Sequence, residues 1–259
     1  MQHSFLDKYS DRDSVIHRLD PRTKFFVTVV FILMVVITPA AQWYGFAFYL
    51  LIIAVLLLLS RVPVGYVLRR SLLILPFVGI VAISIPFIKH GEVIGSLDIW
   101  LWHMQVTRTG LETFATILSK AWLSALSLIL LISTTRVIDL LKGLEQLRVP
   151  LVLIMILSFM YRYIFVLTDD IMRMKQARDS RNFGGSRMWQ LKTLGNMIGT
   201  LFVRSYERGE RVYSAMLARG YDGQTKTLRK LRLNTADFTF GIMLCIPLVL
   251  LGVWINLVH

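Results

Sequence analysis

The second half of the chain is organised around two short basic segments, ARDSRNF at residues 177–183 and ARGY at residues 218–221. Each segment ends a stretch that is predicted to form a long helix. Asn and Gly readily adopt the left-handed conformation that follows a helix C-terminus, so Asn182 and Gly220 are the predicted stop positions. Arg181 and Arg219 then become exposed cations at two helix ends, where the helix dipole favours positive charge.

An exposed guanidinium can bind a carboxylate through two parallel hydrogen bonds, which suits insertion into an acidic socket of a partner protein. A single arginine in the last turn of a helix is more often an ordinary solvated side chain. Two arginines placed in the same way at the ends of consecutive helices favour the docking interpretation for both.

The composition is that of a polytopic membrane protein. Of the 259 residues, 55% are hydrophobic, and the mean hydropathy is +0.61. Several apolar runs approach the length that crosses a bilayer, so we expect an all-α fold with about five transmembrane helices. Residues 1–24 are mostly polar and charged, which argues against a cleavable signal peptide before the first run. The single cysteine, Cys245, excludes an internal disulfide and a cysteine-based metal cluster.

The formal net charge is +13, and the distribution of the basic residues along the chain fits a membrane topology. Short loops rich in Lys and Arg stay on the cytoplasmic side. Basic side chains gather before the first apolar run and after the second, which places both of these segments inside. The links at residues 38–42 and 89–108 carry few basic residues and are expected outside. Residues 168–234 hold 14 basic and six acidic side chains, so we expect this stretch inside as well.

The first helix is predicted to start with Asp20 as its N-cap and Pro21 as its first residue. Pro76 and Pro86 are expected to kink the third span. Lys120 is a cation inside the fourth span, where a functional or partner-facing role and snorkelling toward the interface are equally supported. The predicted spans end at residue 38 for the first helix and cover residues 43–59, 71–88, 111–133 and 238–258 for the others.

The apolar run at residues 151–167 could cross the membrane by hydropathy alone. A crossing there would place the basic residues 168–234 outside, against the positive-inside tendency. We therefore predict one helix of about 32 residues and roughly 48 Å at residues 150–181, on the cytoplasmic side. The predicted domains are residues 1–133 with four spans and a cytoplasmic N-terminus, residues 134–234 as a cytoplasmic coupling region, and residues 235–259 as a C-terminal span.

The coupling region is predicted to contain three helices. A short amphipathic helix covers residues 136–147, and a second long helix covers residues 188–219. Gly195 and Gly199 lie one turn apart in the second long helix, and small residues at this spacing allow another helix to cross closely. The two long helices are therefore expected to cross at these glycines and to splay their arginine ends apart.

An ordered set of short motifs adds a resemblance to a known family. The motifs are LDPR at residues 19–22, TT at 134–135, LRVP at 147–150, YRY at 161–163 and the two arginine segments. Together they resemble the transmembrane component of energy-coupling-factor transporters, in particular the cobalt branch CbiQ. The resemblance implies a non-catalytic subunit in the bacterial or archaeal cell membrane that joins two ABC-type ATPases to a substrate-binding membrane subunit. It also implies that ATP is bound by the partner ATPases and that this chain binds no cofactor.

In this family, Ala-Arg-Gly motifs at the ends of two cytoplasmic helices dock in grooves of the ATPases. The second motif is intact as Ala218, Arg219 and Gly220. The first departs from the pattern, because its place is taken by Ser180, Arg181 and Asn182. Arg178 is a second candidate for the first docking arginine. Arg181 is favoured because Asn182 can supply the left-handed stop.

Other functions are less well supported. A transmembrane component for nickel, biotin or another vitamin is one alternative, and a polytopic membrane enzyme is another. Asp169 and Asp170 do not form a magnesium diphosphate site, because Arg173 stands where a DDxxD pattern needs its second carboxylate. No Gly-rich phosphate loop and no helical histidine pair is present, so neither ATP hydrolysis nor a metal site is expected in this chain. The basic run at residues 226–232 suits contact with the anionic lipid bilayer better than with nucleic acid.

Overall fold

The computed structural model describes residues 14–39, 42–88, 93–99, 102–147, 149–181, 186–223 and 234–257 of the chain. The chain divides into two compact units. Residues 2–143 together with 231–259 form the first, called the bundle below, and residues 144–230 form the second, called the helix pair. The predicted boundaries at residues 134 and 234 separate membrane spans from a cytoplasmic region, not one compact unit from another. They stay a prediction.

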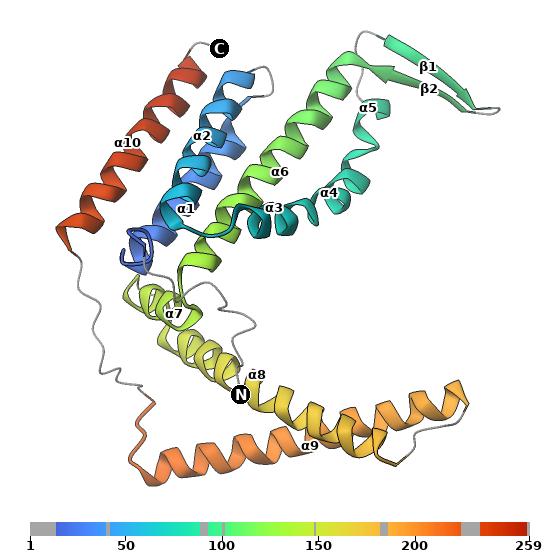
Figure 1. Ribbon diagram of the computed structural model, residues 1–259, viewed down its shortest axis with the longest axis vertical. Coiled ribbons are helices and arrows are strands. Elements are labelled where there is room, and N and C mark those ends of the chain that lie inside the picture. The colour runs from blue at the N-terminus through green and yellow to red at the C-terminus, as the bar shows by residue number, and fades with distance from the viewer. Residues whose placement is uncertain are drawn as a thin grey trace. The chain divides into compact units, whose positions relative to one another are not determined.

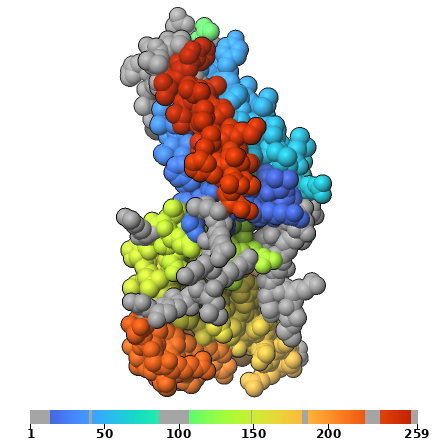
Figure 2. Space-filling view, turned by 90° about the vertical axis from the view of Figure 1, so that its left-hand side faces the viewer, coloured from blue at the N-terminus to red at the C-terminus, as the bar shows by residue number. Residues whose placement is uncertain are grey.

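Four long helices form the frame of the bundle (Figure 1). They are α1 (Pro21–Ile37), α2 (Trp43–Ser60), α6 (Arg108–Thr134) and α10 (Thr235–Leu257). Helix α6 packs against α1 and α2 and also against the short helices that follow α2. Helix α10 lies against α1 on the outer face of the bundle (Figure 2).

The third predicted span is a broken helix. Its pieces are α3 (Val64–Leu72), α4 (Leu75–Ala82) and α5 (Ile85–Ile88). Pro76 and Pro86 are the second residues of α4 and α5. A proline ring clashes with the carbonyl four residues before it, and those residues are the last of α3 and α4. The predicted kinks are therefore confirmed as breaks in the helical hydrogen bonding, although Leu73, Ile74 and Ile83 keep right-handed helical backbone angles.

A small antiparallel hairpin precedes α6. Strands β1 (Val93–Ile99) and β2 (Trp102–Thr107) pair from Val93 opposite Thr107 to Ile99 opposite Trp102. This hairpin lies in the segment predicted only as an outside loop, and it is the one departure from helical structure among the described elements. Runs of Val, Ile, Trp and Thr favour strands, but the segment was too short and too mixed to predict them from its sequence.

The core of the bundle joins its helices through ring packing and polar contacts. The rings of Phe31 and Tyr49 meet edge to face, with centroids 5.6 Å apart. The Tyr49 side chain is fully buried, and its hydroxyl lies 3.0 Å from Thr38 Oγ1. Trp122 on α6 donates from Nε1 to Ser71 Oγ on α3 at 3.0 Å. These contacts satisfy polar atoms that would otherwise be buried without partners.

Both ends of α1 are capped. The Asp20 carboxylate accepts a hydrogen bond from Arg22 N at 2.9 Å, and Pro21 is the first helical residue, so the predicted start is confirmed. At the other end, Lys120 Nζ donates to Val36 O at 2.7 Å. The last carbonyls of a helix lack partners within it and carry partial negative charge, so Lys120 stabilises the end of α1.

Two glycines of α10 bring it close to α1. A Cβ on Gly241 would lie 3.3 Å from Thr23 Cγ2, and a Cβ on Gly252 would lie 2.7 Å from Met34 Sδ. Small residues on one face let two helices approach closely in a membrane. The close packing of α1 and α10 therefore depends on these positions, which the sequence alone did not single out.

The predicted all-α polytopic fold with about five spans is confirmed. Five stretches in the described part of the chain are long and apolar enough to cross a membrane: Trp43–Ser60, Val64–Ala82, Arg108–Thr134, Leu151–Asp179 and Thr235–Trp254. Helix α1, with 17 residues, is slightly shorter than these. The stretch Leu151–Asp179 has the composition of a span, so its cytoplasmic location stays a prediction that rests on charge.

The helix pair contains two long helices, α8 (Leu151–Asp179) and α9 (Arg187–Ala218), and the end of α7 (Val137–Gln146). Their 29 and 32 residues correspond to about 44 and 48 Å. Both helices lie within two residues of their predicted bounds. No residue of α9, all of which the structure describes, is buried.

Candidate functional site

Helices α8 and α9 are antiparallel, so each arginine end lies beside the start of the other helix (Figure 1). Three contacts establish this order. They are a groove shared by Arg181 and Trp189, an ion pair of Asp170 with Arg208, and a hydrogen bond from the Tyr221 hydroxyl to Met155 Sδ at 2.7 Å. Residue numbers that increase along α9 are therefore paired with residue numbers that decrease along α8.

Helix α9 ends in a complete Schellman motif. Gly220 has a φ of +80°, in the left-handed region that favours glycine. Tyr221 N donates to Met216 O at 3.0 Å, and Gly220 N donates to Leu217 O at 2.9 Å. These are the two hydrogen bonds that define the motif. The predicted stop at Gly220 is confirmed, and it leaves the exposed Arg219 at the negative end of the helix dipole.

Helix α8 ends in hydrogen bonds that turn back on its last turn. Ser180 donates to Gln176 O from both its N and its Oγ, each at 2.9 Å. Arg181 N donates to Arg178 O at 3.1 Å. Asn182, the predicted stop of this helix, lies outside the described residues, so its left-handed conformation stays a prediction.

The two candidate arginines of the first segment differ in their surroundings. Arg178 donates from Nε and Nη2 to Asp179 Oδ1, at 3.0 and 2.8 Å. Its guanidinium is thus already held by the neighbouring carboxylate. The Arg181 side chain is exposed and has no polar partner among the residues that the structure describes.

A groove of about 350 Å³ lies between the end of α8 and the start of α9. Its lining combines apolar side chains with the two guanidinium groups: Met174, Ala177, Arg178, Arg181, Trp189, Thr193 and Met197. The start of α9 is fixed there because Ser186 Oγ accepts from Trp189 N. An apolar floor with guanidinium groups beside it suits a partner that presents a carboxylate among apolar side chains.

The two long helices are also joined by an ion pair that the sequence did not reveal. Asp170 Oδ2 lies 3.0 Å from Arg208 Nη2. In the sequence, Asp170 stands out only as part of the Asp169-Asp170 pair, which lacks the further carboxylate of a magnesium site. The antiparallel register of two helices is needed before these positions can be placed opposite each other, and periodicity within one helix does not supply that register.

Gly195 and Gly199 do not lie where α8 meets α9. A Cβ at either position would have no atom within 4 Å. The groove is lined by residues 189, 193 and 197 of α9, and Gly195 follows Thr193 by two residues, about 200° around the helix. The described contact between the long helices therefore uses the opposite face of α9 from the predicted one.

The site as a whole presents two separated cationic ends. Arg181 lies beside the first turn of α9 and Arg219 caps its last turn, so nearly the full 48 Å or so of this helix lies between them. Among the described residues no cluster of three His, Cys, Asp or Glu side chains could hold a metal ion. Two exposed cationic ends so far apart are too distant for one small ligand to reach both.

Comparison with known proteins shows which family the chain resembles. The family described as CbiQ, cobalt transport protein, matches residues 12–228. The chain is 30% identical to the energy-coupling factor transporter transmembrane protein EcfT of Lactococcus lactis subsp. cremoris, over 98% of both chains. It is 29% identical to the protein of the same name from Listeria innocua, over 95% of this chain and 96% of that protein. It is also 29% identical to the one from Thermosediminibacter oceani, over 92% of both.

Proposed function

The chain belongs to the CbiQ cobalt transport protein family and is a transmembrane component of an energy-coupling-factor transporter, and on this premise we propose that it couples two ABC-type ATPases to a substrate-binding membrane subunit for cobalt uptake. A component of this kind is a non-catalytic, multi-pass membrane protein. The ATP that drives transport is bound by its ATPase partners, as the family implies.

The observation that carries the proposal is the placement of Arg181 and Arg219. They occupy opposite ends of an antiparallel helix pair, and each is exposed and without a polar side-chain partner among the described residues. Two such ends favour the docking of one ATPase at each helix end. When nucleotide binding draws the ATPases together, the two ends are pulled with them, and the helix pair transmits the movement.

Arg181 is the docking residue of the first segment in this proposal. Arg178 would have to leave the carboxylate of Asp179 before it could bind an ATPase, which adds the cost of breaking a charge-assisted contact. Arg181 has no such contact to give up among the described residues. Ser180 stands where the intact motif has alanine. Its hydroxyl donates a hydrogen bond to Gln176 O within the same helix end.

The substrate-binding subunit is proposed to cover the exposed apolar face of α9. Leu191, Ile198 and Phe202 are 64%, 68% and 71% exposed, at helical spacing along one face. Gly195 and Gly199 lie among them and leave open space. Large apolar side chains exposed side by side along one helix face favour an interaction surface, and the glycines among them would let a helix of the partner cross closely.

Cobalt is the proposed substrate because the matching family is described as a cobalt transport protein. The relatives named EcfT carry no substrate in their names, and nickel, biotin and other vitamins are the competing possibilities. The substrate site would lie in the partner subunit, since no group of metal ligands forms among the described residues of this chain.

The proposal is tested by purifying the assembled transporter through a tag on this chain in mild detergent. We expect two ATPase chains and one further membrane protein to co-purify, and vesicles containing the complex to take up cobalt when ATP is supplied to the ATPases. An isolated chain with no ATPase bound would contradict the coupling role. A complex that imports nickel or biotin but not cobalt would retain the coupling role and overturn the substrate.

A further inference from the structure

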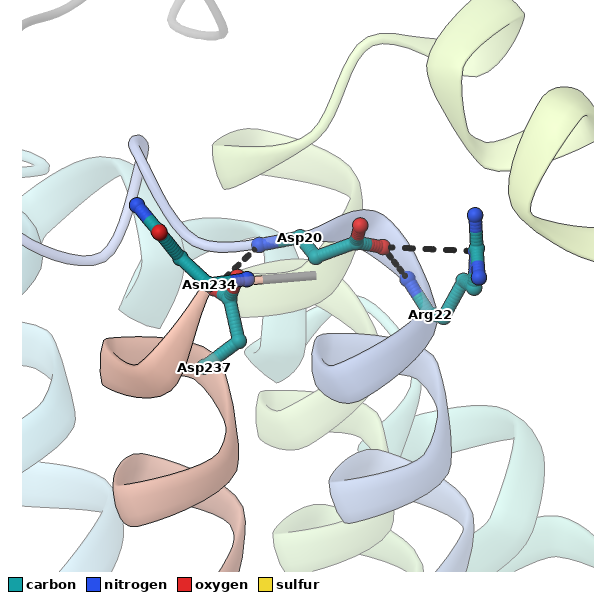
Figure 3. A network of polar contacts seen from close by, with 4 residues as sticks. All are labelled: Asp20, Arg22, Asn234 and Asp237. Atoms are coloured by element: carbon teal, nitrogen blue, oxygen red, sulfur yellow. Dashed lines mark hydrogen bonds and ion pairs between the residues drawn. The ribbon is translucent and has the colours of Figure 1, made fainter. Parts of the chain in front are cut away.

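A buried polar cluster in the bundle joins the start of α1 to the start of α10. Asp237 lies in the first turn of α10, and its side chain bonds in two directions. Its Oδ2 accepts from Asn234 N at 2.8 Å, which closes the start of its own helix, and its Oδ1 accepts from Asp20 N at 2.8 Å (Figure 3). One carboxylate therefore holds the backbone of two segments that are far apart in the sequence.

Asp20 continues the same cluster into α1. Its side chain accepts from Arg22 N at 2.9 Å, and the Arg22 Nε lies 3.7 Å from the same carboxylate oxygen (Figure 3). Asp20 and Asp237 are only 6% and 4% exposed. A buried carboxylate that accepts hydrogen bonds from backbone N–H groups is costly to separate from them, because both partners would lose their bonds away from water.

Lys24 connects the first turn of α1 to the end of α6. Its Nζ donates to Thr134 O at 3.0 Å and to His17 O at 3.3 Å. Thr134 is the last residue of α6, where carbonyls have no partner within the helix. The Lys24 side chain is 6% exposed, and the carboxylates of Asp20, Asp139 and Asp237 attract its charge.

Helix α7 rests on the same turn. A Cβ on Gly143 would lie 3.4 Å from Arg22 Cγ and 3.6 Å from Pro21 Cβ, so the backbone of α7 passes directly over these two residues. Asp139, one turn earlier, brings a carboxylate of α7 toward Lys24. The first turn of α1 thus contacts the end of α6, α7 and the start of α10.

Both docking helices are joined covalently to elements held by this turn. Helix α8 begins eight residues after Gly143, and Asp237 follows Ala218, the last residue of α9, by 19 residues. We propose that the first turn of α1, residues 20–24, is a fixed anchor for both docking helices during transport, with Asp237 as its main positioning residue. This inference rests on the proposed coupling function.

A fixed anchor prevents the movement of the ATPases from being lost as a shift between helices of this chain. If α10 could shift along α1, part of the displacement of the docking ends would be absorbed there instead of reaching the substrate-binding subunit. The close approach of α10 to α1 at Gly241 and Gly252 opposes such a shift along the length of both helices. Loss of the anchor should therefore uncouple transport from ATP hydrolysis without releasing the ATPases.

The test locks α1 to α10 with a disulfide in the assembled transporter. Thr23→Cys and Gly241→Cys are combined in a Cys245→Ser background, because a Cβ at 241 would lie 3.3 Å from Thr23 Cγ2. Thr23 Cγ2 is bonded to Thr23 Cβ, so the two Cβ atoms lie close to the separation of about 3.5 to 4.5 Å that a disulfide requires. We expect oxidised and reduced complexes to import cobalt at rates within about twofold, since an anchor that does not move is unaffected by locking. Transport that stops on oxidation and returns on reduction would overturn the proposal.

A second arm removes the carboxylate. Asp237→Ala should keep both ATPases and their ATP hydrolysis, lower cobalt uptake per ATP by about tenfold, and regain uptake when the 23–241 disulfide is formed. Glu112→Ala, which removes an exposed carboxylate of α6, is the matched control and should change nothing. Full uptake in Asp237→Ala, or no recovery with the disulfide, would contradict the anchor. If Asp237→Ala accumulates only in the disulfide form, that rescue supports it.

Failure of the anchor and failure of ATPase docking give different experimental results. Docking is read from ATPase retention in variants of Arg181 and Arg219, whereas the anchor is read from uptake per ATP in complexes that retain their ATPases. A transporter that keeps its ATPases without either arginine would refute docking, and the disulfide result would still report whether α10 moves on α1.

Discussion

Asp170 on α8 and Arg208 on α9 form an ion pair with 3.0 Å between Oδ2 and Nη2, and this contact joins the two long helices about two thirds of the way along each. The side chains are 20% and 33% exposed, and Arg208 Nη1 is buried with no hydrogen-bond partner among the described residues. The pair is half buried, so its energy is larger than that of a solvated surface pair and smaller than that of a fully buried one.

We expect Asp170→Ala and Arg208→Ala each to loosen the helix pair. Their double-mutant cycle should give a coupling energy of about 1 kcal/mol, measured by thermal unfolding of the purified chain. The reversed pair, Asp170→Arg with Arg208→Asp, should recover part of the loss. Arg211→Ala, which removes a same-helix pair with the exposed Glu207, should have almost no effect. Additive single effects at 170 and 208 would mean that the contact does not hold the helices together.

Removal of either docking arginine should weaken ATPase binding. Arg219→Ala and Arg181→Ala are each expected to cost about 2 to 5 kcal/mol, because in the proposed complex each removes the partner of a desolvated ATPase carboxylate. Arg178→Ala should cost less, since Asp179 already holds that side chain. Arg219→Glu should be worse than Arg219→Ala because it sets like charges together.

The measurement for the arginine variants is the dissociation constant of the ATPases from the detergent-solubilised complex. A compensating charge reversal in the ATPase socket should restore part of the binding to Arg219→Glu. If the double variant Arg181→Ala with Arg219→Ala still retains two ATPases and transports at the unmodified rate, the two arginines are only solvated helix ends.

The end of α9 depends on the left-handed conformation of Gly220. Gly220→Ala should destabilise this end by about 1 to 2 kcal/mol, because its φ of +80° strains a residue with a Cβ. Gly220→Asn should be milder, since asparagine tolerates this region. Gly209→Ala is the control, because a Cβ there meets nothing and should instead stabilise the helix by roughly 0.5 to 1 kcal/mol. Helix content on heating, followed by circular dichroism, separates the three variants.

The side of the membrane on which α8 and α9 lie can be tested by labelling. In a Cys245→Ser background, Ser186→Cys should resist an impermeant thiol reagent in intact cells and react after permeabilisation. Gln42→Cys, in the link between the first two helices, should react from outside. Labelling of Ser186→Cys in intact cells would show that the Leu151–Asp179 stretch crosses the membrane.

Local chemistry predicted the ends of the helices well. The N-cap at Asp20, the breaks at Pro76 and Pro86 and the stop at Gly220 each depend on residues within a few positions, and all are present in the structure. Apolar run length likewise predicted the number of spans, although α8 enters that set in place of the slightly shorter α1.

Contacts between distant segments could not be predicted in this way. The glycine pair that was singled out, Gly195 and Gly199, faces open space, whereas Gly241 and Gly252 are the glycines that pack on another helix. Both pairs have spacings that suit helix packing, and only the arrangement of the helices distinguishes them. The same limit applied to Asp20 and Asp237, which are 217 positions apart and share a hydrogen bond.

Because no residue of α9 is buried, the chain is expected to be unstable in the cell until its partners cover this helix. A helix of 32 residues with large apolar side chains open to its surroundings is what quality-control proteases and chaperones bind. We expect newly made chains that find no partner to be degraded rapidly, and co-expression of the other subunits to lengthen their half-life. The amount of transporter would then follow the scarcest subunit, because surplus copies of this one are removed.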